Sequence, residues 1–113
     1  MSARLPTGIV VSALLRRVND AGGLGMVLAK GDAQAGAILV LTRENGGNPR
    51  FIERGLGFDG AGALVASGPQ DTENEEEISE YWARRRRSDP DLWVIELDIP
   101  QAERFAAETI IGD

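Results

Sequence analysis

The stretch DLWVIEL (residues 91–97) has the alternation of a β-strand buried on at least one face. It follows a predicted helix rather than a hairpin turn, so it can enter a sheet either parallel or antiparallel to its neighbours. Alternation places Leu92, Val94 and Glu96 on one face of the strand and Trp93, Ile95 and Leu97 on the other.

The preceding segment predicts a helix from Glu73 to about Arg87. Thr72 and Glu75 have the spacing of a capping box, which marks a helix start. Asp89-Pro90 ends the helix, because proline disfavours helical geometry in the residue before it. The apolar stripe expected to hold this helix against the core is Ile78, Tyr81 and Trp82.

Two apolar runs near the start of the chain, LGMVLAK (24–30) and GAILVLTR (36–43), predict a hairpin of central, well-covered strands. A helix over 9–20 precedes them, and the turn ENGGNP (44–49) follows them. RFIERGL (50–56) alternates as a third strand, and GFDGAGALVASGP (57–69) is typical of a glycine-rich loop with one short apolar insert. Residues 99–110 predict a short terminal helix.

These elements predict a single α+β domain over residues 1–113. The sheet is antiparallel or mixed, with about four strands and two or three helices in the order α-β-β-β-α-β-(α). Tight connections between the first strands favour helices gathered on one face of the sheet.

Composition excludes several chemistries. The 113 residues include no cysteine and no histidine, so disulfides, thiolate nucleophiles and histidine-based catalysis or metal binding are absent. The net charge of −6 argues against nucleic acid and anionic membranes as main partners. No stretch approaches the roughly 20 apolar residues of a membrane span. We expect a soluble, cytoplasmic protein without a cofactor.

Three motifs have a functional and a structural interpretation. The run Arg84–Arg87 has the chemistry to bind phosphates, but it also stands at the C-terminal end of a helix, where cations stabilise the dipole. GLGFDG (55–60) matches a dinucleotide fingerprint without the helix that should follow it. The carboxylates of Asp32, Asp89 and Asp91 are candidates for an acid pair or a hard-metal site, or for turn capping.

The stretches VSALLRR (11–17), GDAQAGAILV (31–40) and DPDLWVIE (89–96), in this order, resemble a small bacterial family called domain of unknown function 1491. The resemblance spans most of the chain and implies no reaction or ligand. It ranks the polar residues within the matching stretches first as site candidates. These are Arg16, Arg17, Asp32, Asp89 and Asp91, with Trp93 beside them.

We therefore expect a binding or protein-interaction module, in which the surface near Arg16, Asp32 and Asp91 engages a protein or a small ligand. The first alternative is a hydrolase or isomerase that uses carboxylates and a divalent ion. The second is a nucleic-acid-binding module that acts through Arg84–Arg87.

Overall fold

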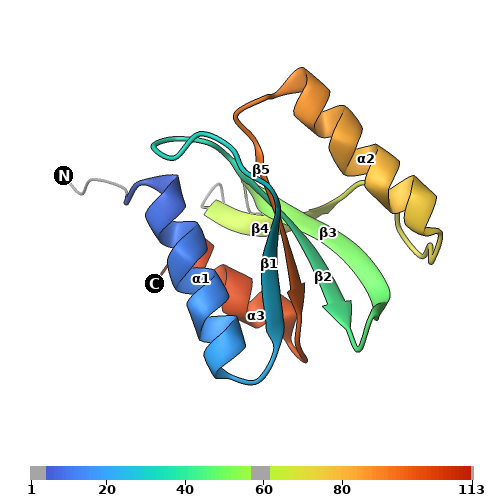
Figure 1. Ribbon diagram of the computed structural model, residues 1–113, viewed down its shortest axis with the longest axis horizontal. Coiled ribbons are helices and arrows are strands. Elements are labelled where there is room, and N and C mark those ends of the chain that lie inside the picture. Colours follow the sequence, from blue (N-terminus) through green and yellow to red (C-terminus); the bar gives the residue numbers. More distant parts are fainter. Residues whose placement is uncertain (1–4, 57–61, 113) are drawn as a thin grey trace.

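The computed structural model describes residues 5–56 and 62–112, which form a five-stranded mixed sheet and three helices (Figure 1). None of the helices in these two ranges is both long and apolar enough to cross a membrane. The elements are α1 (Thr7–Asp20), β1 (Leu24–Ala29), β2 (Ile38–Glu44), β3 (Gly47–Leu56), β4 (Gly62–Ser67), α2 (Glu75–Ser88), β5 (Trp93–Asp98), α3 (Ala102–Ala106) and a turn of π-helix, η1 (Ala107–Ile111).

The strand order is β1-β5-β2-β3-β4, with β5 antiparallel to β1 and parallel to β2. The predicted hairpin between 24–30 and 36–43 is therefore wrong, because β5 lies between these strands. Three side chains of β5, Val94, Ile95 and Leu97, are fully buried. A strand with this much apolar surface on both faces is most stable with a neighbour on each side.

Helices cover both faces of the sheet, which corrects the expectation that they gather on one face. α1 and α3 pack on the face that carries Val40, Ile52 and Ile95. α2 packs through Ile78 on the face that carries Leu41 and Val94. Because strand residues alternate between faces, β2 and β5 supply apolar side chains to both cores.

β4 replaces much of the loop that the glycine-rich sequence predicts. It pairs antiparallel with β3, from Leu56 opposite Gly62 to Phe51 opposite Ser67. Its weak strand propensity is overridden by the ladder that β3 offers. Of the fingerprint-like stretch GLGFDG, Gly55 and Leu56 lie in β3, and residues 57–60 lie outside the described residues.

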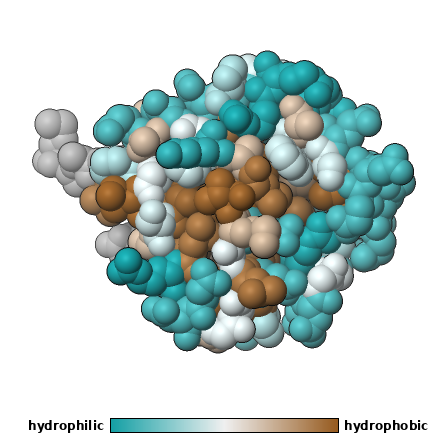
Figure 2. Space-filling model, in the orientation of Figure 1, coloured by the Kyte–Doolittle hydropathy of each residue, from teal (hydrophilic) through white to brown (hydrophobic). Residues whose placement is uncertain are grey.

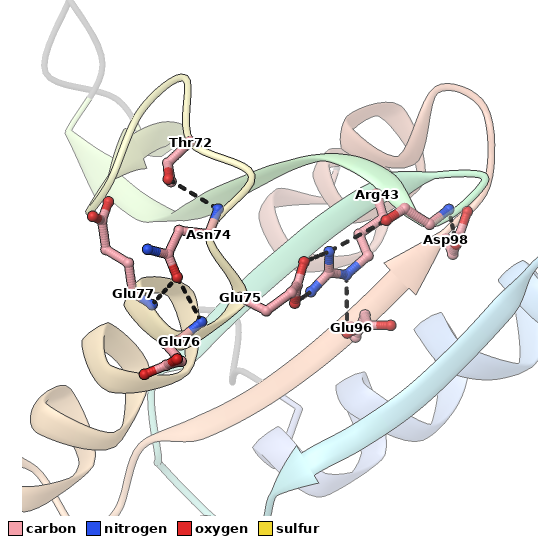
Figure 3. Close-up of polar contacts among 9 residues, drawn as sticks. Arg43, Thr72, Asn74, Glu75, Glu76, Glu77, Glu96 and Asp98 are labelled. Atoms are coloured by element: carbon pink, nitrogen blue, oxygen red, sulfur yellow. Dashed lines mark hydrogen bonds and ion pairs between the residues drawn. The ribbon is translucent and has the colours of Figure 1, made fainter.

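The helix ends differ from the sequence expectations by a few residues, as capping explains. The N-cap of α2 is Asn74 rather than Thr72, because the Asn74 side chain accepts hydrogen bonds from the amides of Glu76 and Glu77. Thr72 supports the cap by accepting a bond from the Asn74 amide (Figure 3). The predicted terminal helix is divided into α3 and η1.

We predict that Asn74→Ala destabilises the protein by about 1 kcal/mol, since two amides of α2 lose their acceptor. Ser79→Ala, at an exposed position within the same helix, is the matched control and should leave stability unchanged. Urea unfolding followed by circular dichroism measures both. Equal stability of the two variants would show that Asn74 does not cap α2.

Candidate functional site

The segment between β1 and β2 meets the turn before β5 through main-chain contacts. The Asp91 carbonyl accepts a hydrogen bond from the Asp32 amide at 3.0 Å. The indole Nε1 of Trp93 donates to the Asp32 carbonyl at 2.8 Å, and the Trp93 amide donates to the Ala37 carbonyl at 2.8 Å. We call this contact between residues 31–37 and 89–93 the junction. It unites four of the sequence-predicted candidates: Asp32, Asp89, Asp91 and Trp93.

Two of the candidate carboxylates at the junction, those of Asp32 and Asp89, close turns. One Asp32 oxygen accepts bonds from the amides of Gln34 and Ala35, at 3.2 and 2.8 Å. One Asp89 oxygen accepts a bond from the Asp91 amide at 3.1 Å. Across residues 5–56 and 62–112 there is no group of three or more acidic side chains placed to hold a metal ion. The geometry at the junction is that of turn capping.

α1 is attached to the same segment at its first turn. The Thr7 hydroxyl donates to the Gly36 carbonyl at 2.8 Å, and the Thr7 amide donates to the Gln34 carbonyl. The next amide, of Gly8, donates to the Ala33 carbonyl at 2.9 Å. Since these amides already have acceptors, the start of α1 does not offer them to an anion.

The two remaining candidates, Arg16 and Arg17, lie toward the other end of α1, about 15 Å along the helix from Thr7 at 1.5 Å per residue. Arg17 donates to Glu108 at 2.6 Å and to Thr109 at 2.7 Å, which attaches η1 to α1. Arg16 is exposed. The structure therefore separates the arginines from the aspartates of the junction.

The run Arg84–Arg87 faces several directions. Arg85 forms two hydrogen bonds with Glu53 of β3, at 2.7 and 2.8 Å, and one with the Tyr81 hydroxyl. Arg86 donates to the Pro90 carbonyl, and Arg84 lies over the Tyr81 ring. The hydrogen bonds from Arg85 lower the pKa of Glu53, and Glu53 raises the pKa of Arg85. Arg85 and Arg86 of the run thus hold α2 in place through contacts within the protein.

A second ion-pair group holds the other end of α2 (Figure 3). Arg43 of β2, with a side chain only 10% exposed, contacts Glu75 at 2.7 Å and Glu96 at 3.3 Å. The hydrogen bonds with Glu75 raise the pKa of Arg43, and Arg43 in turn lowers the pKa of Glu75. Asp98 accepts bonds from the amides of the 45–46 turn, at 2.7 and 2.8 Å. Sequence reasoning missed this group because its members are far apart along the chain.

A hollow of about 740 Å³ lies between the first turn of α1, residues 34–38, β3 and η1. Aliphatic side chains, including Val10, Ile38 and Ile110, line much of it. Glu53 also contributes to the lining, but its carboxylate is bonded to Arg85. Such a lining suits contact with apolar groups better than acid-base chemistry.

The outer edge of β1 is the exposed feature that sequence reasoning did not find. The Gly25 amide donates to the Asn19 side chain at 3.0 Å, so this amide points away from β5. By alternation the Val27 amide points the same way, and no strand in the described part of the chain pairs with that edge. Leu24, Met26 and Val27 are 66, 49 and 42% exposed.

This strand was predicted to be central and well covered, which is wrong because β5 displaces it to the edge of the sheet. Figure 2 shows an apolar band across the middle of the face on which Figure 1 places α1 and β1. No charged residue or proline interrupts LGMVLA. Natural edge strands usually carry such residues to prevent pairing with other chains.

A family model described as protein of unknown function DUF1491 matches residues 5–107. The chain belongs to this family. The DUF1491 assignment confirms the resemblance found in the three sequence stretches. No curated protein matches the chain.

Solved structures of similar proteins, among them DUF1491 family members, have the same fold. The crystal structure of a family member from Caulobacter crescentus CB15 is 34% identical, with a TM-score of 0.75, and the alignment covers 90% of this chain and 94% of the other. The NMR structure of a family member from the same organism is 33% identical, with a TM-score of 0.71 and coverage of 92 and 94%. The solution structure of Atu0922 from A. tumefaciens is 30% identical, with a TM-score of 0.67 and coverage of 97 and 94%.

We predict that Gly31→Ala destabilises this DUF1491 protein by about 3 kcal/mol or prevents folding, because a Cβ there would collide with the Asp91 carbonyl oxygen. Gly47→Ala is the matched control, since its Cβ would have only the Glu44 carbonyl oxygen nearby, at 3.8 Å. Thermal unfolding compares the variants. A Gly31→Ala protein as stable as Gly47→Ala would contradict the tight junction.

We also predict a pH-dependent contribution from the Glu53–Arg85 pair. The pKa of Glu53 in the folded protein lies below its ordinary value of 4.5. The ionised carboxylate therefore stabilises the fold at pH values above 4.5, and this stabilisation is lost as the pH falls through the lowered pKa of the folded protein. Wild type should exceed Glu53→Gln in its free energy of unfolding by about 1 kcal/mol near neutral pH, and the difference should shrink as the pH falls below 4.5.

Glu103→Gln serves as the control for this pair. Glu103 forms an exposed ion pair with Arg50, in which both side chains are 49% exposed, so its loss should cost less than about 0.5 kcal/mol. Urea unfolding at several pH values gives both differences. A Glu53→Gln difference that stays constant at every acid pH at which the protein remains folded would contradict the lowered pKa.

Proposed function

We propose that this DUF1491 protein is a protein-interaction module that binds an extended chain segment at the outer edge of β1. The observation that carries the proposal is a strand edge that no strand of the described residues pairs with, with exposed apolar side chains and no charge or proline within the strand. Added strands gain affinity from main-chain hydrogen bonds and specificity from alternate side chains.

β1 is better suited to this role than β4, the strand at the opposite edge of the sheet. η1 packs against β4, whereas on the outer edge of β1 the Asn19 side chain of α1 holds only the Gly25 amide and no strand of the described chain pairs with the rest. β4 also carries glycine and alanine at its start, which offer little side-chain surface to a partner.

The β1 edge offers a partner two kinds of contact. The amide and carbonyl of Val27 point outward, as does the Gly25 carbonyl, and these can pair with the main chain of an added strand. Met26 and Leu24 are exposed on the α2 side of the sheet, and Val27 is exposed on the α1 side. A segment with apolar residues on both faces would contact all three.

The enzyme alternative has less support. The Asp32 and Asp89 carboxylates close turns, and the Glu53 carboxylate is held by Arg85, so these three acids are already engaged by the fold. The nucleic-acid alternative also has less support, because Arg85 and Arg86 are engaged in contacts within the protein. We further propose that the module acts in the cytoplasm, which fits a chain without cysteine.

The proposal predicts that short extended peptides, selected from a random displayed library, bind at β1. Val27→Lys should weaken such binding by at least about tenfold, because a charge then interrupts the apolar edge. Val65→Lys introduces the same charge into β4 at a similarly exposed valine and should leave the affinity unchanged. Isothermal titration measures the affinities.

Amide chemical shifts of the bound protein should change along β1 and much less along β4. Folding of each variant is checked by the dispersion of the same spectra. If no peptide is selected, or if both valine variants weaken the selected peptides equally, the proposed binding edge is wrong.

A further inference from the structure

We infer that the segment bound at β1 is the β1 strand of a second copy of this chain, which gives a two-fold symmetric dimer with a continuous sheet. This inference rests on the proposed function, since it uses the same strand edge. The evidence is that the edge is complementary to itself in hydrogen bonding, in side chains and in charge.

Hydrogen bonding places the symmetry axis beside Val27. Antiparallel strands related by a two-fold axis can pair a residue with its own counterpart, and each then donates its amide to the carbonyl of the other. The Val27 amide and carbonyl point outward, as this pairing needs. At the N-terminal side Asn19 already occupies the Gly25 amide, and after Val27 a bulge between Val27 and Ala29 breaks the alternation, so new pairing centres on Val27.

The side chains that this pairing brings together are apolar. Val27 meets Val27 of the other copy on the α1 side of the sheet, and Met26 comes beside Leu28 of the other copy on the opposite side. Val27 and Met26 are 42 and 49% exposed in the single chain. Two copies therefore cover apolar surface that one copy leaves in water.

The charges at the two ends of β1 are opposite in sign. Lys30, the single lysine of the chain, follows the C-terminal end of the strand. At the N-terminal end, α1 ends at Asp20, and Leu24 pairs with Asp98 of β5. Antiparallel pairing brings the basic end of each copy to the acidic end of the other. A partner strand with a different sequence would match both ends only if it carried the same arrangement of charges.

The oligomeric state tests the inference directly. Sedimentation velocity from about 5 to about 500 µM, a range that covers weak interfaces, should show wild type passing from monomer to dimer. Val27→Lys should remain monomeric throughout, since two lysines would then face each other at the axis. Val65→Lys, the matched variant on β4, should dimerise as wild type does.

A charge exchange provides the second test and distinguishes a second copy from other partners. Lys30→Glu and Asp20→Lys should each weaken dimerisation by about threefold or more, because each places like charges at both ends of the paired strands. The double variant Lys30→Glu/Asp20→Lys should recover affinity close to that of wild type. Restoration is expected only if the two residues meet across the two copies.

The outcomes separate this inference from the proposed function. A wild type that stays monomeric over the whole range, while selected peptides still bind at β1, would overturn the dimer and leave the binding edge standing. A dimer that survives Val27→Lys would overturn the inference, because it would use another surface. If wild type stays monomeric and no peptide binds at β1, both proposals are wrong.

Discussion

The carbonyl group of Asp91 lies where the segment after β1 and the turn before β5 cross. The Asp32 amide donates to it, and the Cα atoms of Gly31 and Gly36 lie so close that neither position has room for a Cβ. Only glycine allows this approach of two main chains. The contact sets where β5 enters the sheet.

The remaining architecture follows from this entry point. β5 begins with Trp93 hydrogen-bonded to residues 32 and 37, and it then runs between β1 and β2 with both faces buried. Thr7 fixes the start of α1 to the same segment, so α1 lies along β1 on one side of the sheet. The position of β1 at the edge is thus a consequence of the junction.

The sequence predicted where helices and strands lie more accurately than it predicted which strands pair with each other. The apolar runs 36–43 and 91–97 and the apolar stripe through Ile78 identified buried strands and a helix correctly, because alternation and helical periodicity are local properties. The hairpin of 24–30 with 36–43 was wrong, since a short glycine-containing connection does not reveal that a strand from residue 93 onward will enter between them. β4 was missed because its stability comes from β3 rather than from its own composition.

The candidate site shows the same limit. The residues ranked first through the family resemblance include Asp32, Asp91 and Trp93, and the structure does bring these together, but through main-chain contacts that shape the fold. The exposed edge of β1 depends on strand order, so its sequence alone could not distinguish it from a covered strand. Asn19 gave no sequence signal, because its role exists only once α1 and β1 are packed.

Amide hydrogen exchange of β1, measured by NMR in dilute solution where the protein is monomeric, reports whether the outer edge of this strand is unpaired. The Val27 amide should exchange rapidly, because it points away from the sheet, and the Met26 amide, which faces β5, should be protected. Equal, strong protection of both amides in the monomer would contradict this prediction, because the outer edge of β1 would then already be paired within one chain.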